Sequence, residues 1–112
     1  QRAHFNLGVV YLNLKEYHKA VEQFEEATNL VPDYAEAYVN LGRAYEGLHM
    51  DRQARRAYEK AVEFAPNSPQ AQLILGKLLY RTGKRSAAAK AFKEVMRLAP
   101  NSDFAKEARR YL

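Results

Sequence analysis

Apolar residues recur along the first part of the chain at the spacing of amphipathic helices. Two sets are separated by the polar stretch "KEY". The first set is Leu7, Val10, Tyr11 and Leu14, and the second is Ala20, Phe24, Ala27 and Val31. Side chains three, four and seven residues apart lie on one face of a helix. The pattern therefore predicts two helices joined by a short turn.

The same pattern returns with a period of 34 residues, as Pro32, Pro66 and Pro100 show. Four other columns align in this register: Leu7, Leu41 and Leu75; Gly8, Gly42 and Gly76; Ala20, Ala54 and Ala88; and the aromatic Phe24, Tyr58 and Phe92. Each proline ends a second helix, because it lacks an amide donor and disfavours helical angles in the preceding residue. We expect helix pairs over residues 1–34, 35–68 and 69–102, followed by one more helix over 103–112.

Glycine inside the predicted helices needs a physical reason, because it costs roughly 0.5–1 kcal/mol relative to alanine. Gly8, Gly42 and Gly76 share one position in the first helices. We expect each to lie opposite the recurring alanine of the second helix, so that the two backbones approach closely. The recurring aromatic residues would then fill the wedge between neighbouring helix pairs.

Turn and capping residues mark several helix ends. Lys15, His49 and Gly83 stand where a left-handed residue often follows a helix, and only the glycine takes that conformation without strain. Ser68 predicts an N-cap, with Pro69 at the first helical position.

A capping pair predicts one further helix start, and an apolar stripe predicts a helix in the tail. Asp33 followed by Glu36 predicts a capping pair. In the tail, the apolar stripe is Phe104, Ala108, Tyr111 and Leu112, and the residues facing away are Lys106, Glu107, Arg109 and Arg110. This amphipathic tail predicts a solvating helix, because a repeat array must end on a polar face.

These motifs together resemble the tetratricopeptide repeat. They are the 34-residue period, Leu-Gly followed three residues later by Tyr11 or Tyr45, the later alanine and aromatic, Ala27 and Ala61, and the closing proline. The resemblance implies an all-α fold, a right-handed superhelical α-solenoid of about seven helices in antiparallel pairs, forming a single domain over residues 1–112. An early aromatic of the family is present as Tyr38 but is replaced by His4 and Gln72. The abrupt start of the pattern suggests a fragment of a longer protein.

The resemblance also implies a peptide-binding concave groove lined by the first helices. The candidate groove residues are Phe5, Asn6, Val9, Val39, Asn40, Arg43, Leu73, Lys77 and Arg81. Apolar members would give affinity, Asn6 and Asn40 would reach a peptide backbone, and Arg43, Lys77 and Arg81 would hold an acidic or carboxylate-terminated peptide. Alternatively, the asparagines are ordinary at their repeat position and the cations are ordinary solvent-exposed charges.

A family subgroup holds acidic chaperone tails with a carboxylate clamp, and this chain departs from its pattern. The five clamp positions hold Phe5, Val9, Asn40, Gln70 and Ile74. Only Asn40 matches, which disfavours that kind of binding.

Composition excludes several other chemistries. The chain has no cysteine, and His4, His18 and His49 occupy unrelated repeat positions without ligand spacing. The glycines are isolated within helices, so no phosphate loop is expected. Glu25 and Glu26 are interpreted as a solvated face. We expect no enzyme, no metal and no cofactor, and no apolar run approaches the roughly 18 residues of a membrane helix.

Charge is uneven along the chain and sharpens the choice of partner. Residues 1–34 carry a net charge of −2, residues 69–102 carry +6, and the whole chain carries +5. The leading hypothesis is a non-enzymatic adaptor that binds a peptide segment of a partner protein. The alternatives are self-association into a homo-oligomer and nucleic-acid binding. Nucleic acid is not expected, because the basic residues are not interleaved with aromatics.

Overall fold

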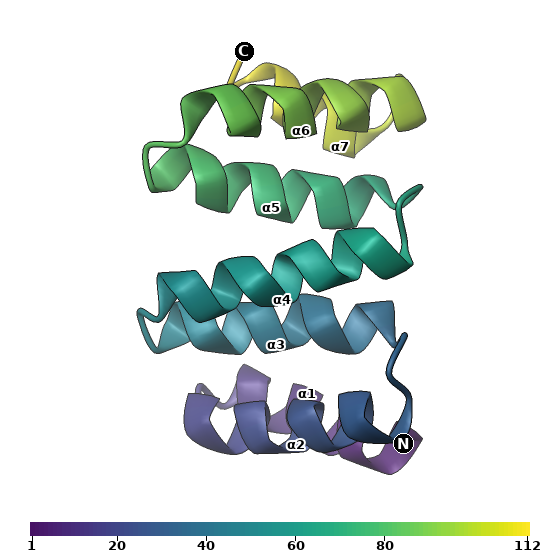
Figure 1. Ribbon diagram of the computed structural model, residues 1–112, viewed down its shortest axis with the longest axis vertical. Helices are drawn as coiled ribbons and strands as arrows, with labels where there is room; N and C mark the ends of the chain where they lie inside the picture. Colours follow the sequence, from purple (N-terminus) through teal and green to yellow (C-terminus); the bar gives the residue numbers. More distant parts are fainter. The chain divides into compact units, whose positions relative to one another are not determined.

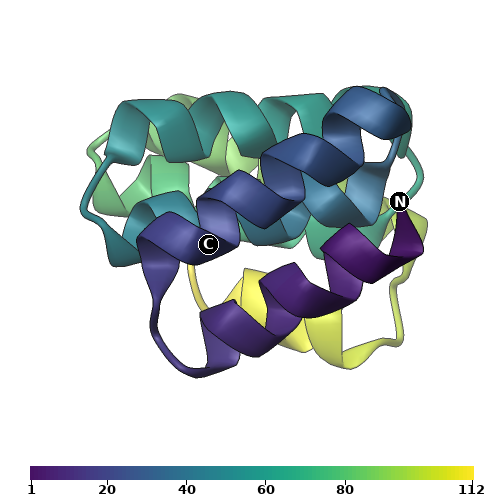
Figure 2. The same ribbon diagram turned by 90° about the horizontal axis from the view of Figure 1, so that it is seen from below.

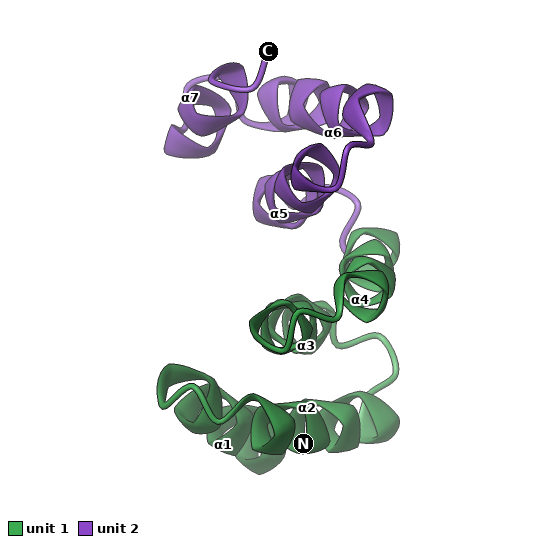
Figure 3. Cartoon of the chain, turned by 90° about the vertical axis from the view of Figure 1, so that its left-hand side faces the viewer, with its two compact units in different colours: residues 1–64 green, residues 65–112 purple.

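The computed structural model describes residues 1–112 and contains seven α-helices and no strand (Figure 1). The helices are α1 Arg2–Asn13, α2 Tyr17–Leu30, α3 Ala35–Gly47, α4 Asp51–Phe64, α5 Pro69–Arg81, α6 Arg85–Leu98 and α7 Asp103–Arg109. The predicted all-α fold of about seven helices is confirmed. The chain divides into two compact units, residues 1–64 (unit 1) and residues 65–112 (unit 2), coloured separately in Figure 3. None of the helices has the length and apolar character that crossing a membrane requires.

Unit 1 is built by helices that pack in chain order. α1 packs on α2, α2 on α3 and α3 on α4, and α1 also contacts α3. Figure 2 shows α1 and α2 side by side, joined by their short turn. The core of this unit includes Phe5, Ala20, Phe24, Ala27, Ala37, Leu41, Ala44 and Ala57. Burying a large apolar side chain contributes roughly 1.5–3 kcal/mol, so the fully buried Phe24 is a major contributor.

The recurring glycines make room for aromatic rings, which corrects the expectation that each faces mainly a small alanine. A Cβ atom at Gly8 would lie 2.6 Å from the Phe24 ring, and one at Gly42 would lie 2.3 Å from the Tyr58 ring. These distances are shorter than any van der Waals contact. The aromatic residue of each second helix therefore packs directly on the glycine of its own first helix.

The predicted left-handed turn residues are confirmed. Lys15 has a φ angle of 61°, His49 of 59° and Gly83 of 86°. Lys15 and His49 carry a Cβ that crowds the backbone in this conformation, at a cost of roughly 1–2 kcal/mol.

Of the predicted helix caps, one is confirmed and one is wrong. The Ser68 hydroxyl oxygen accepts a hydrogen bond from the Ala71 amide at 3.2 Å, and Pro69 begins α5. By contrast, the N-cap of α3 is Tyr34, without a side-chain capping bond, so Asp33 and Glu36 form no capping pair. The start of α3 is held by packing instead, because the Tyr34 ring stacks on Phe5 with centroids 5.0 Å apart.

The apolar face predicted for α1 is largely exposed. Leu7, Val10 and Leu14 are 40%, 50% and 63% exposed, whereas Phe5 is buried against α2. One period later, Leu41 and Ala44 belong to the core that α2 covers. The same pattern is thus buried in α3 but lacks a covering helix in α1.

Unit 2 consists of α5 and α6 packed on each other, with α7 against both. The Tyr111 ring stacks on buried Phe92 at 4.7 Å, and Ser102 caps α7 by accepting from the Ala105 amide at 3.1 Å. The predicted tail stripe is wrong in part. Phe104 and Leu112 remain exposed, and Ala105 fills the buried position beside Ala108. A helix one turn shorter than the stripe presents the small alanines to α6.

Candidate interaction surfaces

Four of the candidate residues in unit 1 reach the surface of the first helices α1 and α3. Asn6 and Arg43 are exposed, and Val9 and Asn40 are half-buried. The Arg43 guanidinium donates a hydrogen bond to the Asn40 amide oxygen at 3.1 Å. Arg43 lies on α3, four residues after the buried Val39. The packing of α3 in the core therefore fixes where the Arg43 side chain leaves the helix.

Three of the four apolar candidates lie deeper than a groove lining requires. Phe5 and Val39 are each 8% exposed, and Leu73 is 6% exposed. Phe5 is engaged by the Phe24 ring at 5.9 Å as well as by Tyr34. These side chains therefore stabilise the helix packing, and they leave little surface for direct contact with a ligand.

In unit 2, the cations predicted on α5 lie next to α7. Lys77 and Arg81 are four residues apart, so both lie on one face of α5, and both are exposed. The Lys77 ammonium forms an ion pair with the Glu107 carboxylate at 2.6 Å. Glu107 was predicted to face away, and this contact corrects that prediction. A charge-assisted hydrogen bond of this length shows that Lys77 can hold a carboxylate in this position.

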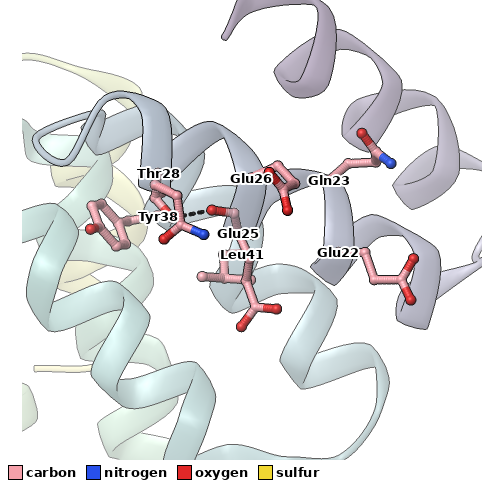
Figure 4. Close-up of a pocket in the computed structure, with 8 residues that line it drawn as sticks. Glu22, Gln23, Glu25, Glu26, Thr28, Tyr38 and Leu41 are labelled. Atoms are coloured by element: carbon pink, nitrogen blue, oxygen red, sulfur yellow. Dashed lines mark hydrogen bonds between the residues drawn. The ribbon is translucent and has the colours of Figure 1, made fainter.

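A pocket between α2 and α3 was not expected from the sequence. It has a volume of about 660 Å³ and opens to solvent. Figure 4 draws the eight residues that line it and labels all of them but Asn29. They are Glu22, Gln23, Glu25, Glu26, Thr28, Asn29, Tyr38 and Leu41. We call it the α2–α3 pocket. Glu25 and Glu26 both line it, whereas sequence reasoning had only placed them on a solvated face. The spacing of Glu22, Glu25 and Glu26, which lie within one turn of each other, was the signal that could have revealed it.

A second, smaller pocket of about 220 Å³ adjoins the first. Its lining is Tyr38, Leu41, Tyr45, Gln53, Arg56, Ala57 and Lys60. The two pockets share Tyr38 and Leu41 of α3. Their outer walls differ in charge, because α2 contributes glutamates and α4 contributes Arg56 and Lys60.

Tyr45 connects the pockets to the acidic helix. Its hydroxyl donates a hydrogen bond to the Glu25 carboxylate at 3.2 Å. Partial burial, followed by the charge of Glu25 and this hydrogen bond, raises the pKa of Tyr45 above its usual value. The contact between α2 and α3 therefore stabilises the neutral form of the Tyr45 phenol.

The histidines and acidic residues do not assemble a metal site. No group of three or more histidine, cysteine, aspartate or glutamate side chains is arranged to hold a metal ion. His4 instead makes a hydrogen bond of 2.8 Å to Gln23 and so connects α1 with α2.

Paired helices with a 34-residue period, closed by a short amphipathic helix, define an all-α repeat protein of the helical solenoid class. A tetratricopeptide repeat profile matches residues 2–67, and a second one matches residues 52–103. The chain belongs to the tetratricopeptide repeat family.

Solved structures of this family are closely similar in fold. The TPR domain of Arabidopsis OM64 is 26% identical with a TM-score of 0.87, over 97% of this chain and 90% of that one. MamA (41-end) from Desulfovibrio magneticus RS-1 is 31% identical with a TM-score of 0.85, over 91% of this chain and 58% of that one. The first TPR of Spaghetti (RPAP3), bound to the HSP90 peptide SRMEEVD, is 22% identical with a TM-score of 0.87 over 97% of this chain and 87% of that one, which shows the fold alone. No curated protein matches the sequence significantly.

Proposed function

We propose that this chain is a non-enzymatic adaptor that binds an acidic or carboxylate-ended segment of a partner protein on its first-helix faces. The observation that carries the proposal is the Lys77–Glu107 ion pair, in which a cation at a predicted binding position already holds a carboxylate at 2.6 Å. A peptide carboxylate that replaces Glu107 would meet the same ammonium group.

The strength of the existing pair is compatible with exchange. The side chains of Lys77 and Glu107 are 43% and 35% exposed. Ion pairs with this degree of exposure contribute about 0–1 kcal/mol, because water and salt screen them. An incoming carboxylate that makes additional contacts would therefore compete successfully with Glu107.

Arg43 offers a second cation on the α1 and α3 face. Its guanidinium has five N–H donors, and one of them is used by Asn40. The remaining donors suit a carboxylate, which a guanidinium binds with two parallel hydrogen bonds. The burial of Phe5, Val39 and Leu73 means that polar recognition contributes more to this proposal than apolar contacts do.

Solved structures with the same fold support peptide recognition in general terms. The Spaghetti (RPAP3) structure contains an HSP90 peptide, and PcrH was solved with the chaperone-binding region of PopB. This chain lacks four of the five residues of the chaperone-tail clamp, so we propose a different acidic segment as its ligand.

The proposal is tested by selecting random peptides displayed on phage against the chain and measuring selected peptides by fluorescence anisotropy. We expect the selected peptides to be enriched in aspartate and glutamate. Replacing Arg43, Lys77 and Arg81 together by alanine should weaken their binding by about tenfold or more. The matched control replaces Arg52, Lys84 and Arg110 by alanine. It removes the same amount of charge outside the candidate groove residues and should change the affinity little.

Two results would reject this function. One is a set of selected peptides without acidic enrichment. The other is equal loss of affinity in the binding-face variant and the control variant, which would indicate a non-specific charge effect. The peptide SRMEEVD serves as a reference ligand and should bind more weakly than the selected peptides.

A further inference from the structure

The surface of the second helices reverses its charge between the two ends of the repeat pattern. Glu22 and Glu25 of α2 correspond to Lys90 and Lys93 of α6, which lie two periods or 68 residues later. All four side chains are exposed. They lie away from the buried residues of their helices, so core packing does not determine their charge.

The acidic side of this reversal is a shaped pocket. Glu22, Glu25 and Glu26 line the α2–α3 pocket, which has Tyr38 and Leu41 at its α3 side (Figure 4). Glu22 and Glu26 form no ion pair within the chain, and the Glu25 carboxylate is paired only with the Tyr45 hydroxyl. The pocket thus combines three glutamates that form no ion pair with a partly apolar wall, and the cations Arg56 and Lys60 line only the adjoining smaller pocket.

The basic side is an exposed face of α6, which we call the α6 lysine face and define as Lys90 and Lys93. Neither ammonium group has a partner within the chain. The neighbouring cation Arg97 is already paired with Glu94. Half-buried Ala89 and Met96 lie on the same helix and add apolar surface beside the lysines.

Like charges on neighbouring turns of a helix repel each other by a few tenths of a kcal/mol per pair. Contact with a surface of opposite charge would offset this repulsion on both surfaces. One chain carries both halves, because unit 1 holds the pocket and unit 2 holds the lysines. A second copy therefore has the charge, the helical spacing and the apolar side chains that the α2–α3 pocket accepts.

We propose that the α6 lysine face of one copy docks into the α2–α3 pocket of a second copy. This contact is separate from the proposed peptide binding, since it involves none of Arg43, Lys77 and Arg81. The two contacting surfaces are different, so the contact is heterologous. Each added copy leaves one pocket and one lysine face free, and association continues head to tail unless the geometry closes a ring.

Sedimentation velocity over a range of protein concentrations tests the association directly. The contact depends on exposed charges, whose interactions reach about 30 Å at 0.01 M salt and about 3 Å at 1 M salt. We expect concentration-dependent assemblies at the low salt concentration and a monomer at the high one. A monomer at every concentration in low salt would overturn the proposal, and RNA retention by such a monomer would assign the lysine face to nucleic acid instead.

Charge reversal identifies the surfaces. An acid-reversed variant carries Glu22→Lys and Glu25→Lys, and a base-reversed variant carries Lys90→Glu and Lys93→Glu. Each variant alone should lose association by about tenfold or more, because its two surfaces now carry the same sign. An equimolar mixture should associate again, since the reversed pocket of one variant complements the reversed helix of the other.

The mixture also controls for folding, because misfolded variants cannot restore a specific contact. A charge-matched control, Asp33→Lys with Glu63→Lys, should associate nearly as the unmodified chain does. Association that survives both reversals, or a mixture that stays monomeric, would show that the copies meet through other surfaces and would overturn the proposal.

Discussion

At the scale of single residues, the glycine with the least space for a side chain is Gly42, which packs against an aromatic ring. A Cβ atom at Gly42 would lie 2.3 Å from the Tyr58 ring, and at Gly76 the nearest atom of Phe92 would lie at 2.9 Å. Both rings are fully buried, so neither can move out to solvent. The recurring glycine is therefore required because the opposing aromatic ring leaves no space for a side chain.

Replacing Gly42 by alanine should lower the free energy of unfolding by about 1–3 kcal/mol, because overpacking a dense core forces side chains and backbone to shift. Chemical denaturation measures the change as a lower midpoint with an unchanged slope. The same replacement at Gly76 should cost less, since the added atom meets the ring at a longer distance.

A double-mutant comparison tests the cause. Tyr58→Leu should destabilise the Gly42→Ala protein less than it destabilises the unmodified protein, because the smaller side chain relieves the contact. Strictly additive effects would mean that the alanine methyl group and the ring do not conflict.

At the scale of helices, the sequence period predicts where elements begin and end better than it predicts which face each one buries. The turns at Lys15, His49 and Gly83 were predictable, because a short joint after a helix requires a left-handed residue. The exposed face of α1 was not predictable from periodicity, since the pattern of Leu7 recurs at Leu41, and only the latter has α2 against it.

Competing local contacts explain the other errors. The Asp33 and Glu36 pair satisfied a capping rule, but stacking of Tyr34 on Phe5 sets the start of α3. In the tail, the larger Phe104 fitted an apolar stripe, yet the packing space against α6 accepts the small Ala105.

The joint between α2 and α3 should respond to alkaline pH through Tyr45. The folded state raises the pKa of Tyr45 above its usual 10.0, first through burial and then through Glu25. A raised pKa means that the folded state holds the proton more tightly, so the stabilisation is fully present below about pH 10 and is lost as the pH rises through the folded pKa.

Thermal melting of the unmodified protein and of Tyr45→Phe from about pH 8 to about pH 11 measures this effect. The advantage of tyrosine over phenylalanine should shrink above pH 10. Tyr11→Phe is the matched control, because Tyr11 lies one period earlier and its hydroxyl has no carboxylate partner. A constant difference between the unmodified protein and Tyr45→Phe across this range would mean that folding does not raise the pKa of Tyr45.

At the scale of the molecule, the candidate binding residues divide between the two units. Arg43 lies in unit 1, and Lys77 and Arg81 lie in unit 2. The family pattern predicts these positions, because a repeat places the same helix face at each period. It cannot predict Glu107 as the partner of Lys77, since α7 departs from the repeat. The acidic wall of the α2–α3 pocket likewise depends on Glu22, Glu25 and Glu26, which belong to none of the repeat columns, although Tyr38 and Leu41 of its other wall do follow the family pattern.

A single domain over residues 1–112 remains a prediction, and a matched pair of core substitutions tests it. Phe24 and Phe92 are 68 residues apart and fully buried in units 1 and 2. Changing either one to leucine leaves a partial cavity that should cost less than the about 3–5 kcal/mol of a full truncation to alanine. Each unit has its own core, and repeat proteins transmit stability mainly between neighbouring elements.

Hydrogen exchange read by mass spectrometry should therefore locate each effect. Phe24→Leu should raise exchange more in α1–α4 than in α5–α7, and Phe92→Leu should give the reverse, because local opening follows the contacts that each ring makes. The reciprocal pattern matters more than either result alone, since it cancels differences in intrinsic exchange rates between segments. Equal increases throughout the chain for both variants would mean that residues 1–112 open as one cooperative domain.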